Sequence, residues 1–357
     1  MVTPEALPHH QLPPVLSARK RLILKAIVES YIGSATPVGS GQVVREYVPD
    51  VSSATVRNEM VGLEEAGLLT QPHTSAGRVP SEGGFRYFVR QLMEERALTR
   101  AEQSTIRREL FAVQLAREEW LDVATTLLAR VARAAGIISA PVAAQCRVKH
   151  VELLAIQERL GLLVLVLQEG TVKQQLIELP EDTDQTDLSA ASSRLNQRIH
   201  GLSRSELEAL GEPISDLEAF ITARLVSLMS QIDEHQRKEF HHTGMVELLE
   251  LPEFQHPAQA RRIVRLLEQP EELFGLLETL PWSDGMHVLI GARGPRTAIL
   301  EDLGLVVSYY GVESVAGGFV GVLGPMRLPY AEVVPVVRYV SQVMTESLDD
   351  LLSPGAK

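Results

Sequence analysis

The stretch from residue 52 to residue 67 constrains the fold of this chain more than any other. A Ser-Ser pair at 52–53 can cap a helix over residues 54–66, and Gly67 can end that helix in the left-handed conformation. Apolar residues occupy positions i, i+4 and i+7 of this helix: Val56, Met60 and Leu63. Such a narrow stripe buries only one side of a helix. The other side is therefore expected to face outwards.

The outward side of this helix begins with side chains that suit the edges of DNA bases. They are Ser53, Thr55, Arg57 and Asn58. A guanidinium group can fork onto guanine, an amide onto adenine, and hydroxyl groups onto either base. A helix that presents such residues at its N-terminal end after a tight turn, here Asp50-Val51, is typical of the recognition helix of a helix-turn-helix.

Two further helices are expected before the recognition helix. Ser17 can cap a first helix over about 18–32, for which Gly33 supplies a stop. A brief second helix over 41–48 is stopped by Pro49. This order of helices favours a small helix-turn-helix domain.

A β-hairpin is expected directly after the recognition helix. Its strands are residues 68–71 and 78–80, and the small polar loop between them contains Gly77, which is free to adopt a positive φ. Ser81 then caps a helix that closes the core with Phe85, Phe88, Val89 and Leu92. A hairpin in this position is the wing of a winged helix. A surface hairpin without a ligand remains the alternative for any one of its residues.

The charge of the chain is unevenly distributed. The net charge is −12, but residues 17–90 hold nine Lys/Arg against seven Asp/Glu, which leaves −14 for the rest. A locally basic module on an acidic body is compatible with DNA binding, because screening confines phosphate attraction to about 8–10 Å. Three cations, Arg19, Lys20 and Arg21, stand in the first turn of the first helix, where the helix dipole disfavours them. A bound polyanion resolves that conflict; a solvated cluster is the alternative.

The predicted DNA contacts are thus of two kinds. Base reading is assigned to Ser53, Thr55, Arg57 and Asn58, with Ser52 beside them. Backbone contacts are assigned to Arg19, Lys20, Arg21, His73, Ser75 and Arg78.

Four segments of this region resemble the family of heat-inducible transcription repressors, HrcA. They read TPVGS (36–40), VSSATVRNEM (51–60), LEEAGLL (63–69) and QPHTSAGRVPSEGGFRYFV (71–89). The resemblance continues more diffusely at 242–254, 309–330 and 333–344, and departs from the family pattern at 40–42, at Gly83 and at 291–294. It implies a GAF-like body with an inserted dimerisation segment, operators upstream of chaperone operons, relief of repression by heat, and a chaperonin that helps to hold the repressor active.

The remainder of the chain predicts an α+β body after a long linker helix. A Thr99–Glu102 capping box opens this helix within residues 97–145. Strands are expected at 147–157, 160–168, 171–179, 286–291, 303–310 and 315–323, and helices at 187–210, 213–238, 256–280 and 330–349. A central antiparallel sheet with flanking helices fits this order. The expected domains are a flexible leader (1–16), a winged helix (17–96), the linker, and a body (146–357) with the insertion at about 185–250.

No set of residues reaches the threshold for an enzyme, a cofactor or a metal site. Glycine-rich turns at 291–295 and 317–318 are followed by strand where a phosphate-binding loop needs a helix. Acidic residues spaced roughly like calcium ligands lack the glycine and the closing Glu: Asp182, Asp184 and Asp187. The single cysteine, Cys146, fits a reducing compartment, and no apolar run approaches the ~20 residues of a membrane span. A cytoplasmic protein is expected.

The sequence therefore predicts a repressor of heat-shock genes that binds an inverted-repeat operator as a homodimer. Two-fold symmetry of the protein implies two-fold symmetry of the site. Two alternatives stay open. A small molecule could control the same architecture through the GAF-like domain, or the winged helix could serve protein contacts alone or accompany an unrecognised enzyme.

Overall fold

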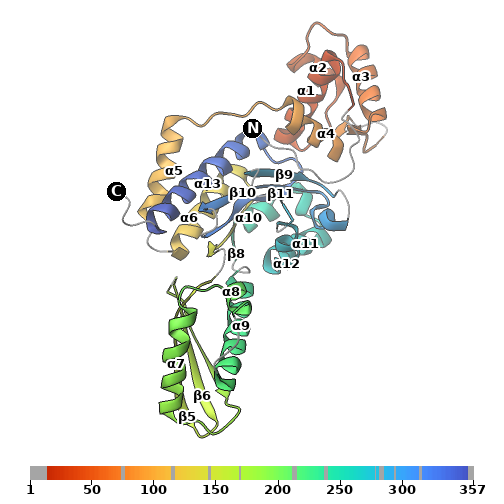
Figure 1. Cartoon of the computed structure of the whole chain (residues 1–357). Helices are drawn as coiled ribbons and strands as arrows, with labels where there is room; N and C mark the ends of the chain where they lie inside the picture. The colour runs from red at the N-terminus through yellow and green to blue at the C-terminus, as the bar shows by residue number, and fades with distance from the viewer. Residues whose placement is uncertain are drawn as a thin grey trace. The chain divides into compact units, whose positions relative to one another are not determined.

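The structure is a computed structural model that describes residues 14–73, 77–113, 117–143, 146–168, 170–210, 215–236, 240–277, 279–280, 285–292, 295–312 and 316–352. The chain divides into two compact units (Figure 1). Unit 1 comprises Met1–Ser139, Phe240–Gly311 and Gly318–Lys357, and unit 2 comprises Ala140–Glu239 and Val312–Gly317. The mixture of helix and sheet confirms the expected α+β class.

Unit 1 begins with a small domain, here called the N-terminal domain (residues 17–92). Its elements are α1 (Ala18–Ser34), α2 (Ser40–Glu46), α3 (Ser53–Glu65), β1 (Leu69–Thr70), β2 (Val79–Pro80), α4 (Glu82–Tyr87) and a π-helical segment, η1 (Phe88–Leu92). Gly67 has the predicted left-handed φ, 72°. The first helix runs beyond Gly33, however, because Ala35 takes the left-handed conformation with φ of 53° and donates its N–H to the carbonyl of Tyr31.

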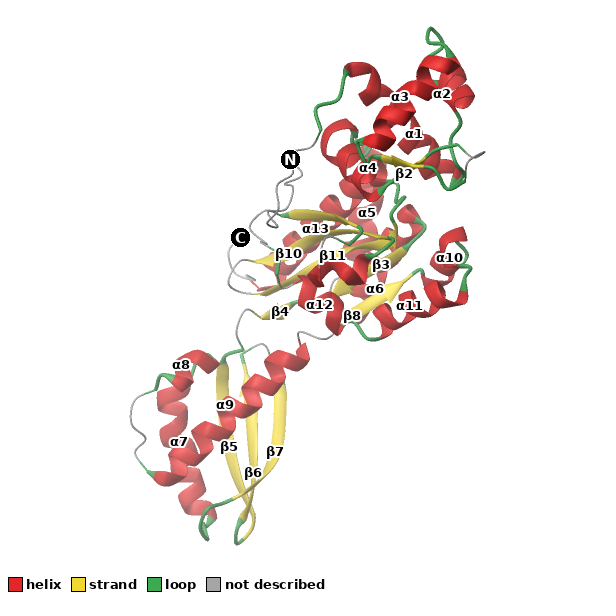
Figure 2. Ribbon diagram, turned by 90° about the vertical axis from the view of Figure 1, so that its right-hand side faces the viewer, coloured by secondary structure: helices red, strands yellow, loops and turns green. Residues whose placement is uncertain are grey.

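The rest of unit 1, here called the body, is a sheet with helices on both faces (Figures 1 and 2). The strands β8 (Phe240–Thr243), β3 (Ala135–Ser139), β11 (Ala316–Pro325), β10 (Leu303–Val312) and β9 (Met286–Ile290) pair in that order. The first two residues of β11 pair with β4 (Val142–Ala143), and these paired residues belong to unit 2. One face carries α5 (Arg100–Ala112), α6 (Arg117–Ala132) and α13 (Tyr330–Leu352). The other side holds α11 (Pro257–Glu268) and α12 (Glu271–Leu277), while shorter segments are α10 (Met245–Leu249), η2 (Pro252–Phe254) and η4 (Pro295–Leu300).

The expected long linker helix is replaced by two helices and a strand. The first helix, α5, begins at the predicted capping box and ends at Ala112. The pKa of Glu102 in this box is lowered to about 2, first by a hydrogen bond from Arg96 and then by the bonds from Thr99. Both α5 and α6 bury apolar residues within unit 1, and the last part of the expected linker forms β3. Short apolar runs such as 135–139 fit a buried strand as well as a helix, which explains the wrong expectation.

Unit 2 is a sheet covered on one face by helices. Its strands β5 (Val148–Gln157), β6 (Leu160–Leu167) and β7 (Val172–Glu178) pair antiparallel in chain order, and its helices are α7 (Gln185–Ile199), α8 (Arg204–Glu208) and α9 (Asp216–Gln236). The strands were correctly placed in the sequence but not in the expected central sheet. Alternate residues of β6, namely Leu163, Leu165 and Leu167, are buried in a core shared with α7 and α9. The separate unit thus begins near residue 140, well before the expected insertion at about 185–250.

Candidate nucleic-acid interface

The buried side of α3 fixes how this helix is presented. Its buried residues are Val56, Met60 and Leu63, as the spacing predicts. Ser52 begins the helix, because its hydroxyl accepts the N–H of Thr55 at 3.1 Å. With this stripe packed inside, the side chains of Arg57 and Asn58 are exposed on the first two turns. These two residues stand where the sequence predicts base-reading groups.

The hydroxyl groups of this region are tied to one another. Ser53 shares a hydrogen bond of 2.9 Å with Ser40 of α2, and Ser52 shares one of 2.8 Å with Thr55. The first contact joins α2 to the start of α3 and holds the turn between them. Hydroxyl groups that are already paired can still accept or donate one more hydrogen bond. The hydroxyl groups of Ser52, Ser53 and Thr55 are therefore partly occupied within the domain.

The predicted cations of α1 lie next to α3. Ser17 caps α1 by accepting the N–H of Lys20 at 3.2 Å, and the first turn contains no acidic residue. Arg19 is 3.7 Å from Glu59 of α3 and remains 56% exposed. The ammonium group of Lys20 lies over Gly62, where a Cβ atom would stand 2.6 Å from its nitrogen. Arg21 is exposed. Arg19 and Lys20 thus place two cations beside α3, and Arg19 faces an acidic partner there.

The hairpin is held more tightly than its polar sequence indicates. Strands β1 and β2 pair at Leu69↔Pro80 and Thr70↔Val79, and Val38 and Arg78 exchange two backbone hydrogen bonds of 2.9 Å. Gly77 has no positive φ; it is required because a Cβ there would lie 2.4 Å from the carbonyl oxygen of Val38. The expectation for Gly77 was therefore right about the residue and wrong about the reason.

The three predicted hairpin contacts have different surroundings. His73 is exposed, and Ser75 lies outside the described residues. Arg78 is only 14% exposed and binds Glu64 of α3 at 2.9 Å. Its Nε is buried and has no hydrogen-bond partner among the described residues. Arg78 thus links the hairpin to α3 and is not the open cation that was expected, and its contact with the DNA backbone stays a prediction.

Sequence reasoning missed the residues that position the predicted contacts. Glu59 and Glu64 hold two of the arginines, Ser40 holds Ser53, and Gly62 makes room for Lys20. The only signal in the sequence is that both acids lie on the outward part of α3. Their partners come from other elements, so no local spacing identifies them.

The described residues offer no sign of a metal centre or a membrane segment. Among them, no group of three or more His, Cys, Asp or Glu side chains could hold a metal ion. None of their helices is long and apolar enough to cross a membrane.

The chain joins a small domain that exposes a helix beside cations to a mixed α+β body, an arrangement typical of transcription regulators. A family described as "HrcA protein C terminal domain" matches residues 118–334. Relatives named heat-inducible transcription repressor HrcA align with nearly the whole chain. The chain belongs to the HrcA family of heat-inducible transcription repressors.

The likeness to individual proteins is consistent along the chain. The HrcA of Herpetosiphon aurantiacus is 39% identical over 94% of this chain and 96% of its own length. Those of a Roseiflexus species and Chloroflexus aurantiacus are 38% and 37% identical, each over 94% of this chain and 95% of their own. A crystal structure described as a hypothetical protein aligns with a TM-score of 0.54 at 23% identity, covering 93% of this chain and 97% of its own, which shows a shared fold.

Proposed function

We propose that the chain represses heat-shock chaperone genes by binding their operator DNA through the N-terminal domain, which acts as a winged helix-turn-helix. The observation that carries this proposal is the pair of exposed residues, Arg57 and Asn58, on the first two turns of a helix anchored by its other side. The N-terminal end of a recognition helix is the part that meets base edges in the major groove. A protein with this target works in the compartment of the chromosome, the cytoplasm.

The remaining contacts are assigned according to their surroundings. We assign base reading to Arg57 and Asn58, assisted by Ser52, Ser53 and Thr55. We assign phosphate contacts to Arg19, Lys20, Arg21, His73 and Ser75. Arg78 supports the hairpin from within, because its charge is directed at Glu64.

A second copy of the chain is the proposed partner of unit 2. Leu154, Leu162 and Leu176 stand side by side in one row across the face of the sheet away from α7 and α9. Leu154 and Leu176 are 39% and 61% exposed, as are Ile156 (51%) and Val172 (59%) from the same sheet. An apolar sheet face of this kind fits an interface between copies. A two-fold dimer presents two copies of α3 to an inverted repeat.

The proposed response to heat follows from the dimer. A dimer binds two half-sites, so separation of the subunits removes the avidity of the second site and releases the operator. The unpaired apolar face would then be open to aggregation. Chaperonins bind such surfaces, which supports a chaperonin as the modulator that returns the repressor to its active form. The body is proposed to be the GAF-like domain of the family, since its sheet is covered by helices on both faces.

A gel-shift experiment tests the proposal. The full-length protein is titrated onto duplexes that carry inverted repeats from upstream of chaperone operons, at two salt concentrations and with competitor DNA. Tight, competitor-resistant binding to one repeat is expected, and Arg57→Ala should weaken it while Arg261→Ala, an exposed arginine of α11, leaves it unchanged. Equal binding to all duplexes contradicts the proposal.

A second candidate function, repression controlled by a small molecule, is favoured by one observation. A cavity of about 300 Å³ lies between the N-terminal domain and the body, both within unit 1. Its size lies within the range of small-ligand sites.

A further inference from the structure

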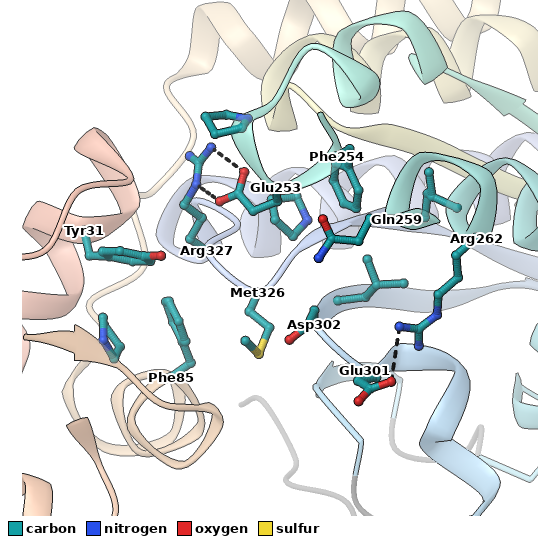
Figure 3. Close-up of a pocket in the computed structure, with 15 residues that line it drawn as sticks. Tyr31, Phe85, Glu253, Phe254, Gln259, Arg262, Glu301, Asp302, Met326 and Arg327 are labelled. Atoms are coloured by element: carbon teal, nitrogen blue, oxygen red, sulfur yellow. Dashed lines mark hydrogen bonds and ion pairs between the residues drawn. The ribbon is translucent and has the colours of Figure 1, made fainter. Parts of the chain in front are cut away.

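The N-terminal domain and the body each contribute residues to the wall of the cavity between them (Figure 3). Tyr31, Pro80 and Phe85 contribute the wall from the N-terminal domain. Apolar side chains of the body complete it: Phe254, Ile263, Leu303 and Met326. The rings of Tyr31 and Phe85 are 6.1 Å apart and inclined at 58°. The cavity therefore offers an aromatic corner on one side and aliphatic and thioether groups on the other.

The two arginines that line the cavity are already neutralised. Arg327 forms an ion pair with Glu253 and donates to the carbonyl of Ile32, near the C-terminal end of α1, at 3.2 Å. Arg262 donates to the carbonyls of Ala298 and Ile299 at 3.0 and 3.1 Å and lies 3.4 Å from Glu301. Neither guanidinium is therefore available as the main anchor for an anionic ligand.

Three acidic residues line the cavity, and Asp302 is the one that has no side-chain partner among the described residues. It follows Glu301 and lies beside Met326, with Tyr31 and Phe85 on one side and Gln259 on the other (Figure 3). Its φ is 60°, a left-handed conformation that Asp tolerates better than most residues. Asp302 is exposed, so its carboxylate is open to a ligand. A carboxylate and two aromatic rings that line one cavity are groups that can bind an organic cation, through a charge-assisted hydrogen bond and cation–π contacts.

Tyr31 adds a hydrogen-bonding group that stays neutral. A tyrosine hydroxyl is protonated at neutral pH, and the pKa of Tyr31 is raised further by burial and by Glu253, against the opposing effect of Arg327. It can donate to or accept from a ligand in the cavity.

We propose that this cavity binds a small amphipathic amine, with its cationic nitrogen on Asp302 and its apolar part against Tyr31, Phe85 and Met326. Because the walls come from both the N-terminal domain and the body, an occupant fixes one against the other. Binding of the amine is thereby coupled to operator affinity, a consequence that rests on the proposed DNA-binding function. By linkage, DNA and amine then alter each other's affinity by the same factor.

The binding step is tested without DNA. Phenethylamine is titrated into the full-length protein by calorimetry at neutral pH, with phenylacetate as the anionic probe of similar size. Saturable binding of phenethylamine alone is expected. Asp302→Asn, which keeps the shape and tolerates the left-handed φ, should weaken it about tenfold or more. Asp349→Asn, an exposed acid of α13 outside the cavity, is the matched control and should bind like the native chain.

A second variant keeps the test decisive. Met326→Trp fills the cavity and should abolish binding while the melting temperature reports that the chain is folded. If either variant unfolds, hydrogen exchange of the native chain provides the same evidence. Protection around Tyr31 and Phe85 should be low without phenethylamine and higher with it. Equal binding of phenylacetate, an unsaturable titration, or unchanged binding by Asp302→Asn overturns the proposed site.

The coupling step uses the operator. Saturating phenethylamine should change the operator affinity of the native chain by about fivefold or more and leave that of Asp302→Asn unchanged. An unchanged operator affinity overturns the coupling. A chain that binds phenethylamine but prefers no operator refutes the proposed DNA-binding function and leaves the amine site standing, so the two failures are distinguishable.

Discussion

The ion pair between Arg78 and Glu64 bears on which of two roles Arg78 has in the hairpin: a contact with DNA phosphate, or a clamp that holds the hairpin on α3. If Arg78 binds a DNA phosphate, its loss should lower the salt dependence of DNA binding by about one unit. If it clamps the hairpin to α3, its loss should lower the stability of the N-terminal domain and leave the salt dependence unchanged. The burial of Arg78, 14% exposed, and the 2.9 Å contact favour the clamp.

The magnitude follows from the exposure of the two partners. Fully exposed ion pairs contribute about 0.2–1 kcal/mol, and breaking a fully buried pair costs about 3–5 kcal/mol. Glu64 is 35% exposed and can be rehydrated when Arg78 is removed. Replacing the arginine also removes its unsatisfied Nε–H, which offsets part of the loss. We therefore expect Arg78→Met, which keeps the apolar stem, to destabilise the N-terminal domain by about 1–2 kcal/mol, or roughly 5–15 °C for a domain of this size.

A double-mutant cycle isolates the pair. Arg78→Met, Glu64→Gln and the double variant are compared by thermal melting, and the coupling energy is expected to be about 1–2 kcal/mol. Operator binding is measured in parallel over a range of salt concentrations. A salt dependence reduced by one unit in Arg78→Met, together with a coupling energy near zero, refutes the clamp and returns Arg78 to the DNA backbone.

Four further outcomes are expected. Arg57→Ala should weaken operator binding by ~1–3 kcal/mol and relax the preference at one base pair, whereas an equal loss on random DNA would move Arg57 to a backbone role. Lys20→Ala should lower the salt slope of binding by about one unit on any sequence, and an unchanged slope removes Lys20 from the contacts. Leu176→Asp should yield monomers in sedimentation, while Val246→Asp, a still more exposed apolar site of unit 1, should keep the native oligomer. A dimer in both variants would refute the sheet interface. Because the pKa of Glu102 is depressed to about 2, its ionised form stabilises the fold above about pH 4.3 and this contribution is lost as the pH falls through 2. Glu102→Gln should flatten the decline of the melting temperature across that window, and an unaltered decline contradicts the assignment.

Local periodicity predicted the parts of the site that depend on a single element. The burial of Val56, Met60 and Leu63 follows from their spacing alone, and so does the exposure of Arg57 and Asn58 on the opposite side. These predictions needed only the geometry of a helix and the preference of apolar groups for the interior.

Contacts between elements lay beyond that reasoning. The pairing of Arg78 with Glu64 depends on how the hairpin turns back on α3, and the need for Gly77 depends on the approach of Val38. In each pair the two residues lie far enough apart in the sequence that the pattern of the residues between them does not indicate whether they come into contact. An exposed cation and a buried clamp therefore have the same local sequence signature.

The sequence also did not indicate to which sheet each strand belongs. The alternation of Leu163, Leu165 and Leu167 predicts a strand with one buried face, but it does not identify what covers that face. In the structure α7 and α9 cover it, which makes unit 2 compact by itself. The periodicity of a strand indicates that one of its faces is buried, but the topology of the chain determines which elements cover that face.

The independence of the unit 2 core bears on how heat can release the proposed operator complex. Leu165, Leu195 and Leu225 of its interior are at most 1% exposed within one chain, so the core does not need a second copy to form. Separation of a dimer through the outward face then requires no unfolding of unit 2. In the proposed mechanism, dissociation would depend on protein concentration as well as temperature, and operator binding would stabilise the dimer by mass action. A release mechanism of this kind is reversible on cooling, provided that the uncovered leucines of the outward face are kept from associating with other chains. In the proposed mechanism, protection of that face, and not refolding of the core, is the step at which a chaperonin would set the amount of active repressor.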